Sequence, residues 1–466
     1  MSNESPPDFL VQDRYASPEE IGDIVCRLFV LSPAWIVSSC GDNNRVVVGD
    51  DYGYYSEGAS LRLLYLANKY GRGPVAFDFP VSLTWIFYAY AALFLGLKIV
   101  PIDPRWPEAR KQAAIARCSI HLTADVVDDF PSGRNRTDTR PIDWLVDALE
   151  LETSGSSGEP KRIVHTRTSL AAQAVLGSRA VGLHVDSHWV SALPMTHASG
   201  LGVMVRSLVA GSAMTVLPEF DPEQFISILK GEGDRWRRPA TVISLVPTML
   251  ERLLDFGFTP EKHLESVILG GAPLDADLRG RALEARIPVR ESWGMTETLG
   301  MISLAPRPFT PGAGIPLRGV DVRADASGEL LVRGPIVAPG LAGEDGWFHT
   351  GDAGFLDEHG FVHVTGRIGS LIISGGENVH PEAVERGLLA TGLVADAHVF
   401  GRPDREWGQV VVAKVVVSDS ATTGEQVRSA ARKLLSPWEV PKEIELVDAV
   451  SRNELGKLDR SPNAGR

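Results

Sequence analysis

Cysteines are few in this sequence, and none of them has a neighbour at metal-binding or disulfide-framework spacing. The 466 residues contain three, Cys26, Cys40 and Cys118, with no CxxC or CxH pattern. An odd, widely spaced set argues against a disulfide framework or a structural zinc site and indicates a reducing compartment. We therefore expect a cytoplasmic protein.

Basic charge is also scarce. With 46 Lys and Arg residues against 59 Asp and Glu residues, the formal net charge is -13. Proteins that bind nucleic acids generally present a basic surface, so we expect no nucleic-acid partner. An anionic nucleotide could still bind, but only at a local site.

The sequence has no long apolar run of the membrane-spanning kind. Its best candidate, residues 81–97, is uncharged for 17 residues but contains Ser82, Thr84 and Gly96. A spanning helix needs about 20 apolar residues, so we expect a buried core helix and no stable membrane span. Membrane contact by this segment is the alternative. The first 13 residues are polar and do not resemble a signal peptide.

Short apolar segments alternate with amphipathic segments over the first two thirds of the chain. The expected strands are residues 75–77, 99–102, 190–193, 214–217 and 267–269, and the expected helices are residues 107–117 and 168–183. This alternation indicates an α/β architecture with largely parallel sheets.

The pattern changes after about Pro316. Residues 320–332 and 355–364 alternate apolar and polar side chains around central turns, which predicts antiparallel hairpins. Beyond Arg367, the expected helices are residues 381–389 and 425–435, and the expected strands are residues 395–400 and 410–417. We therefore predict a large N-terminal domain, residues 1–366, and a small mobile C-terminal domain, residues 371–466.

The segment TSGSSGEPK, residues 153–161, has the chemistry of a phosphate-binding loop. Its hydroxyl donors are Thr153, Ser154, Ser156 and Ser157, and its glycines are Gly155 and Gly158. Glycine lets backbone N–H groups approach a phosphate, and Lys161 can neutralise phosphate charge. The segment is not a Walker A motif, because Pro160 occupies a glycine position and Arg162 follows the lysine. A solvated Ser/Gly loop is the alternative.

This segment resembles the phosphate loop of the acyl/aryl-CoA synthetase, luciferase and peptide-synthetase adenylation superfamily. Four further segments resemble motifs of that superfamily in the same order: WGMTE at 293–297, GWFHTGD at 346–352, GR with SGGEN across 366–378, and LGKLDR at 455–460. The resemblance covers about residues 150–460. It implies an α/β fold, with a large N-terminal domain of stacked, mostly parallel sheets with helices plus a small distorted β-barrel. It also implies a small mobile α+β C-terminal domain.

The resemblance implies an ATP site with one metal ligand. Glu297 would hold Mg2+, which prefers carboxylate and phosphate oxygens, and Thr296 would donate to a phosphate. Asp352 would accept from both ribose hydroxyls. The adenine would lie beside the backbone of Gly270, Gly271 and Ala272 and stack on Trp293. The alternatives are a structural ion pair for Glu297 and a turn position for Asp352.

The C-terminal motifs imply residues for both half-reactions, adenylate formation and thioester formation with coenzyme A. Arg367 would contact the nucleotide from the domain boundary, where the superfamily usually carries Asp or Lys two or three residues later and this chain has Gly369 and Ser370. Lys457 would stabilise the negative charge that develops during attack on the α-phosphate. Gly376 would leave room for the pantetheine arm. A surface position is the alternative for Lys457.

The acid site is implied by weaker resemblances. His197 resembles a superfamily histidine that borders the acyl group. The segment 164–166, Arg206 and the segment 244–248 resemble the o-succinylbenzoate–CoA ligases of menaquinone biosynthesis. A guanidinium such as that of Arg206 would suit the second carboxylate of that acid, with Ser244 in the same pocket. A structural role for His197 and a helix-surface ion pair for Arg206 are the alternatives.

These expectations describe an ATP-dependent acid–CoA ligase. It would adenylate a carboxylic acid, o-succinylbenzoate above others, with release of pyrophosphate, and then form the CoA thioester with release of AMP. Its cofactors and partners would be ATP, Mg2+, coenzyme A and the small-molecule acid. The alternatives are another aryl- or fatty-acyl-CoA ligase and an adenylating enzyme that loads a carrier protein.

Overall fold

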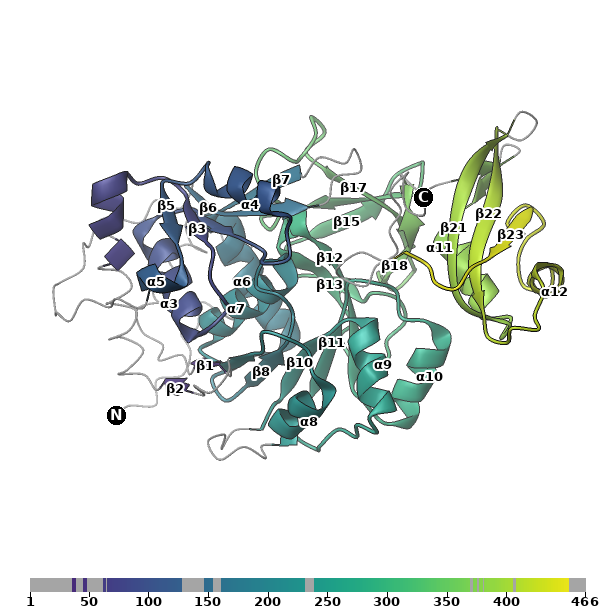
Figure 1. The fold of residues 1–466 in the computed structure, drawn as a ribbon, viewed down its shortest axis with the longest axis horizontal. Helices are drawn as coiled ribbons and strands as arrows, with labels where there is room; N and C mark the ends of the chain where they lie inside the picture. The colour runs from purple at the N-terminus through teal and green to yellow at the C-terminus, as the bar shows by residue number, and fades with distance from the viewer. Residues whose placement is uncertain are drawn as a thin grey trace.

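The computed structural model describes residues 65–127, 146–153, 161–230, 239–368, 372–374, 377–379, 381–404 and 408–451, with the short segments 36–38, 45–47 and 62–63. Figure 1 shows a large body, drawn in purple to green, and a smaller lobe in yellow-green near the C-terminus. The large body is built on two sheets with helices packed between and outside them.

The larger sheet has nine strands in the order β14-β13-β12-β11-β10-β8-β9-β1-β2. Its strands are β1 (Ile36–Ser38), β2 (Arg45–Val47), β8 (His188–Ser191), β9 (Ala213–Val216), β10 (Val242–Leu245), β11 (Ser266–Leu269), β12 (Val289–Met295), β13 (Gly300–Leu304) and β14 (Ile315–Pro316). The central pairs are parallel, and the pairs at both edges are antiparallel. Every residue of β8 to β11 is buried, as expected for parallel strands covered on both faces.

The second sheet has five strands in the order β5-β3-β4-β6-β7. Its strands are β3 (Val75–Phe77), β4 (Ile99–Pro101), β5 (Ile120–Leu122), β6 (Asp147–Thr153) and β7 (Lys161–Thr166). All pairs are parallel except the β6–β7 hairpin. The prediction of largely parallel sheets is thus confirmed. The phosphate-loop residues 154–160 connect β6 to β7 and lie outside the described residues.

Three helices fill the space between the two sheets: α3 (Leu83–Leu95), α6 (Arg167–Val181) and α7 (Ala198–Ala210). Their buried side chains form one core with both sheets. The segment expected to be a core helix is α3, which begins after Ser82 and ends at Gly96 in the left-handed conformation. Within the described residues, no helix is both long and apolar enough to cross a membrane.

The remaining helices of the large body are shorter. They are α4 (Glu108–Ile115), α5 (Ala124–Val127), α8 (Pro222–Lys230), α9 (Pro247–Asp255), α10 (Ala276–Glu284) and the 3-10 helix η2 (Thr296–Thr298). The helices predicted at residues 107–117 and 168–183 correspond to α4 and α6, with ends shifted by no more than a turn. Helix ends are less strongly specified by sequence than the apolar face is, which explains the shifts.

Beyond β14 the chain forms four antiparallel strands, β15 (Asp321–Ala324), β16 (Glu329–Arg333), β17 (Phe348–Leu356) and β18 (Val362–Arg367). Both predicted hairpins are therefore confirmed. These strands form a half-barrel sheet in the order β15-β16-β17-β18, where the resemblance implied a small distorted barrel.

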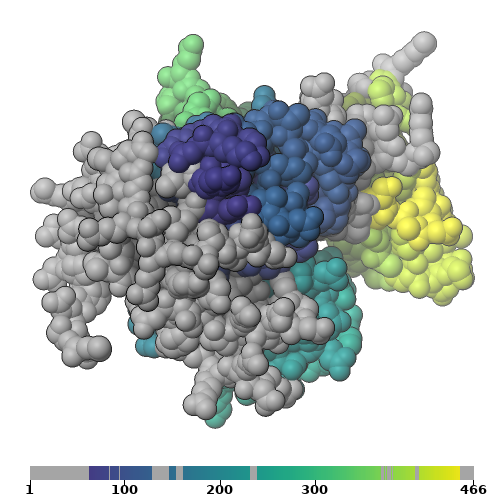
Figure 2. All heavy atoms as spheres, turned by 60° about the vertical axis from the view of Figure 1, so that its left-hand side comes forward, coloured from purple at the N-terminus to yellow at the C-terminus, as the bar shows by residue number. Residues whose placement is uncertain are grey.

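The C-terminal lobe has its own sheet and core. Its elements are β19 (Ile372–Ser374), β20 (Glu377–Val379), α11 (Pro381–Leu389), β21 (Val394–Asp404), β22 (Gly408–Val417), α12 (Gly424–Ala431) and β23 (Glu443–Leu446). A separate hydrophobic cluster joins both helices to β21 and β22. Figure 2 shows this yellow-green part at one edge of the molecule. Residues 369–371 lie outside the described residues, and the domain boundary there stays a prediction.

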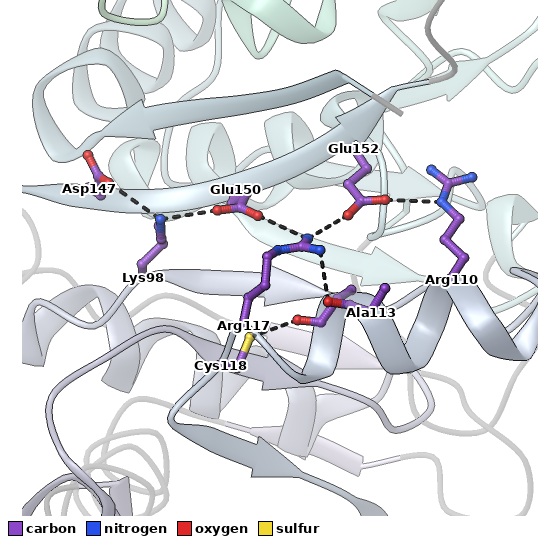
Figure 3. A network of polar contacts seen from close by, with 9 residues as sticks. Lys98, Arg110, Ala113, Arg117, Cys118, Asp147, Glu150 and Glu152 are labelled. Atoms are coloured by element: carbon purple, nitrogen blue, oxygen red, sulfur yellow. Dashed lines mark hydrogen bonds and ion pairs between the residues drawn. The ribbon is translucent and has the colours of Figure 1, made fainter. Parts of the chain in front are cut away.

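A network of charged side chains ties α4 to β6, the strand that leads into the phosphate loop (Figure 3). Arg117 lies 3.2 Å from Glu150 and 2.6 Å from Glu152, which also accepts from Arg110 at 3.0 Å. Lys98 lies 3.1 Å from Glu150. Both glutamates are less than a tenth exposed, so each needs a nearby positive charge to remain ionised.

Replacing Arg117 with Met should destabilise the protein by about 1–3 kcal/mol, because two largely buried carboxylates lose a donor. Urea unfolding followed by tryptophan fluorescence measures the change. The matched control is Arg333→Met, which removes the exposed pair with Asp321 at 2.8 Å and should cost less than about 1 kcal/mol. Equal losses in the two variants would contradict a role for this network in stability.

Candidate functional site

The phosphate-loop lysine and the predicted metal ligand lie together. Lys161 begins β7, Glu297 lies in η2, and the Lys161 Nζ is 3.7 Å from the Glu297 Oε1. At the base of the hairpin, Thr153 Oγ1 donates to the Lys161 carbonyl at 3.4 Å. The Glu297 side chain is 18% exposed, and its oxygens are the ligand type that Mg2+ prefers. These residues fit a nucleotide–metal site.

A buried histidine lies directly behind this pair. His165 is completely buried, its Nε2 donates to the Thr296 carbonyl at 2.8 Å, and its Nδ1 is 3.3 Å from Ser169 Oγ. Burial lowers the pKa of His165 to about 4. The imidazole is therefore neutral near pH 7. Because a carbonyl only accepts, the proton must be on Nε2.

Asp352 is the centre of a second cluster. Its Oδ2 accepts from Trp293 Nε1 at 2.7 Å, and its Oδ1 accepts from Arg367 Nη1 at 2.6 Å. The carboxylate is buried, and each oxygen can accept a second hydrogen bond. The structure thus brings together three residues that the sequence motifs placed at the nucleoside. The contact between Trp293 and Asp352 was not anticipated.

The predicted adenine segment lies at the carboxyl end of β11. Gly270 is half-buried, whereas Gly271 and Ala272 are exposed, and Gly271 has φ of +87°, which favours glycine. Ligands of open α/β sheets bind beyond the carboxyl ends of the parallel strands. The position suits a backbone that lines a nucleotide.

A polar cluster supports the turn before Asp352. Glu329 Oε1 accepts from the Gly351 N–H at 2.8 Å, while its Oε2 is 2.9 Å from His349 Nδ1. The hydrogen bond to Glu329 raises the pKa of His349. Together with Asp325, these side chains place three ligand-type atoms within 4.8 Å of one another. Asp325 accepts from the backbone N–H groups of Ser327 and Glu329, so hydrogen bonds within the protein account for the cluster.

His197 lies at the N-terminal end of α7, where it faces a buried aspartate. Its Nε2 accepts from Arg105 Nη2 at 3.2 Å and is 3.6 Å from Asp103 Oδ2. Burial opposes ionisation of Asp103, but hydrogen bonds from Arg105 and Thr196 outweigh it and lower the pKa to about 2. His197 is thus positioned by a fixed ion pair from the loop after β4.

Arg206 and Ser244 are both buried. Arg206 Nη2 donates to Gln173 Oε1 at 3.1 Å and to the Leu299 carbonyl at 3.3 Å, while its Nε has no partner among the described residues. Burial lowers the pKa of Arg206 to about 10, so it stays charged near pH 7. Ser244 Oγ accepts from Trp189 Nε1 at 2.9 Å. Arg206 lies in α7, which begins at Ala198.

The chain matches known protein families and is similar to curated enzymes. Residues 151–342 match the AMP-binding enzyme family, and residues 383–457 match the AMP-binding enzyme C-terminal domain. A 2-succinylbenzoate–CoA ligase of Bacillus licheniformis is 35% identical over 416 residues, which cover 80% of this chain and 86% of that protein. The corresponding ligase of Bacillus cereus is 35% identical, over 66% of this chain and 68% of that protein.

The chain belongs to the AMP-binding enzyme family. Among solved structures, it is similar to o-succinylbenzoate coenzyme A synthetase from Bacillus subtilis in complex with ATP and magnesium, with a TM-score of 0.80 and 24% identity over 93% of this chain and 98% of that chain. ATP-bound MatB from Rhodopseudomonas palustris gives a TM-score of 0.79 and 24% identity, over 93% and 96% of the two chains. At this identity, the two structures establish a shared fold.

Several of the site residues predicted from the sequence lie outside the described part of the chain. They are Ser154, Gly155, Ser156, Ser157, Gly158, Gly376 and Lys457. Conversely, sequence reasoning assigned no role to Gln173, Asp103 or Arg105. Gln173 alone had a signal, as an amide within the apolar stretch of α6.

As the pH is lowered, the free energy of unfolding of the wild type should decrease more steeply than that of His165→Gln. His165 has a folded pKa of about 4 against an ordinary 6.5, so the unfolded chain binds the proton first as the pH falls. Between pH 7 and pH 5, the preferential protonation of the unfolded chain should lower the free energy of unfolding of the wild type by about 2 kcal/mol, and His165→Gln should lack this loss. Urea unfolding at a series of pH values tests it. Parallel curves for the two proteins would contradict the assignment of a neutral buried imidazole.

Proposed function

We propose that this AMP-binding enzyme is a 2-succinylbenzoate–CoA ligase of menaquinone biosynthesis. The acid carboxylate attacks the α-phosphate of ATP, which forms the acyl-adenylate and releases pyrophosphate. The thiol of coenzyme A then attacks the acyl carbon, which forms the thioester and releases AMP. The curated relatives named for this activity support the proposal over most of the chain.

The observation that carries the choice of acid is the buried charge of Arg206. Arg206 is 4% exposed and, among the described residues, donates only to the neutral oxygens of Gln173 and Leu299, although its guanidinium retains a positive charge. A buried cation without a counter-charge is costly. 2-Succinylbenzoate has two carboxylates, and the one that is not activated would supply the missing negative charge.

For the first half-reaction, the residues bind and orient ATP. Lys161 and Thr296 contact the phosphates, and Glu297 would hold Mg2+, which supplies charge neutralisation at the phosphates. Asp352 accepts from the ribose hydroxyls through its two remaining lone pairs, and Trp293 lies against the base. The Arg367 contact to Asp352 links this nucleoside site to the domain boundary.

For the second half-reaction, we propose a movement of residues 371–466 relative to residues 1–366. Lys457 acts in adenylate formation, where its charge stabilises the pentacovalent phosphorus transition state. Gly376 acts later, as the position where the pantetheine arm passes the backbone. We propose that His197 borders the acyl group in both half-reactions. A cytoplasmic location is proposed, because the cysteines indicate a reducing compartment.

Arg206→Ala should reduce kcat/KM for 2-succinylbenzoate by roughly 30- to 1000-fold, because a charged hydrogen bond worth about 2–4 kcal/mol is lost in the transition state. Benzoate lacks the second carboxylate and should be turned over equally poorly by both proteins. Acid-dependent pyrophosphate release measures both activities, and a medium-chain fatty acid completes the panel.

The matched control is Arg290→Ala. Arg290 is also a buried arginine, but it donates to the backbone carbonyls of Ala305, Ala180 and Val181. Its loss should lower stability without changing the preference among acids. If benzoate or the fatty acid is the better substrate of the wild type, and Arg206→Ala does not change that order, 2-succinylbenzoate is the wrong acid.

Lys457→Ala should abolish adenylate formation but spare thioester formation from supplied acyl-adenylate. A bulky residue at Gly376, as in Gly376→Trp, should do the reverse, because it blocks the thiol arm and leaves the ATP site intact. Pyrophosphate release and CoA-dependent AMP release distinguish the two steps. Loss of the same half-reaction in both variants would rule out alternation of the two domains.

A further inference from the structure

The turn that carries Glu297 into β13 has a strained backbone. Leu299 has φ of +50° and is followed by Gly300 at +92°, so two successive residues are left-handed. Leu299 is completely buried, and the conformation costs about 1 kcal/mol or more for a residue with a Cβ. Such a turn persists only where its surroundings fix it.

Buried side chains donate to the carbonyl groups of this turn. His165 donates to Thr296, Arg206 donates to Leu299, and Gln173 Nε2 donates to Thr298 and to Met301, each at 2.7 Å. Four of the six carbonyls of residues 296–301 are thereby bound by side chains from outside the turn. Thr298 Oγ1 donates to a fifth, that of Gly300, at 2.7 Å.

Two of these donors, His165 and Gln173, belong to a row of residues along one side of α6. His165, Ser169, Gln173 and Gly177 follow one another at intervals of four residues, so Ser169, Gln173 and Gly177 lie on one face of the helix. We call His165, Ser169, Gln173 and Arg206 the polar ladder. Glycine at position 177 leaves room for the Arg206 side chain, since a Cβ at that position would lie 2.4 Å from Arg206 Nε.

The polar ladder lies behind the metal site rather than in it. His165, Gln173 and Arg206 are at most 4% exposed, whereas the Glu297 side chain is 18% exposed and 3.7 Å from Lys161. The ladder therefore acts on Glu297 through the backbone of the turn. Since β7 contributes both Lys161 and His165, it also fixes the turn relative to the phosphate loop.

We propose that His165 and Gln173 are positioning residues, which hold the 296–301 turn so that Glu297 can bind Mg2+ together with ATP. Outer hydrogen-bond partners of metal sites typically contribute 10- to 100-fold to metal affinity. The inference rests on the ATP and Mg2+ dependence of the proposed reaction and not on the identity of the acid.

The test is the ATP affinity of Gln173→Met, measured by calorimetry in excess Mg2+ and again in EDTA. Met has a similar size but cannot donate to Thr298 and Met301. The Kd for ATP in Mg2+ should rise about 10-fold, while the Kd in EDTA stays near the wild-type value. Ser178→Ala is the matched control, because Ser178 is buried on the same helix and donates only to the Val175 carbonyl within the described residues.

A folded Gln173→Met protein with the wild-type ratio of the two Kd values would overturn the proposal, as would an equal loss of affinity in Mg2+ and EDTA. If this variant does not fold, His165→Gln and His165→Leu decide, because Gln keeps a donor near the Nε2 position and Leu does not. We expect the wild-type ratio for Gln and a reduced ratio for Leu; equal ratios refute the proposal. A protein that binds Mg2+ and ATP but does not use 2-succinylbenzoate leaves this inference intact.

Discussion

The arrangement of the candidate site depends on the hydrogen bond between His165 Nε2 and the Thr296 carbonyl. The two residues are 131 positions apart in sequence, the bond is 2.8 Å long, and the imidazole that donates it is completely buried. It joins the strand after the phosphate loop to the turn that carries Glu297. In a low-dielectric interior, leaving either group unpaired would cost about 1–3 kcal/mol, so the contact also specifies how the two sheets are joined.

The buried acidic side chains are paired with basic groups, whereas the buried Arg206 is not paired with an acidic group among the described residues. Asp352 and Asp103 are buried, but each carboxylate accepts hydrogen bonds from an arginine and a second donor. Glu150 and Glu152 are likewise paired with basic side chains on the face of β6. Arg206 and Arg290 both have neutral acceptors only, but Arg206 Nε has no hydrogen-bond partner among the described residues, whereas Arg290 donates from Nε, Nη1 and Nη2. This contrast is the physical reason to assign it to an anionic ligand.

Much of the fold was predictable from local pattern. Short apolar segments identified β3, β4, β9 and β11, and the turns at residues 325–328 and 357–360 identified two hairpins. The uncharged segment at residues 81–97 was correctly interpreted as a core helix, because its capping residues Ser82 and Gly96 limit it to 13 residues. These features depend on neighbours in sequence, where steric and hydrogen-bonding preferences act directly.

The sequence by itself determined the family and predicted the chemical type of the site, since Lys161, Glu297, Asp352 and Arg367 occur within recognisable motifs. Only the tertiary structure decided their partners. Trp293 meets Asp352 across 59 residues, Arg105 meets His197 across 92, and Gln173 meets Thr298 across 125. No local pattern encodes such pairs, because a hydrogen bond between distant segments depends on how helices and sheets pack and on which polar groups that packing removes from water.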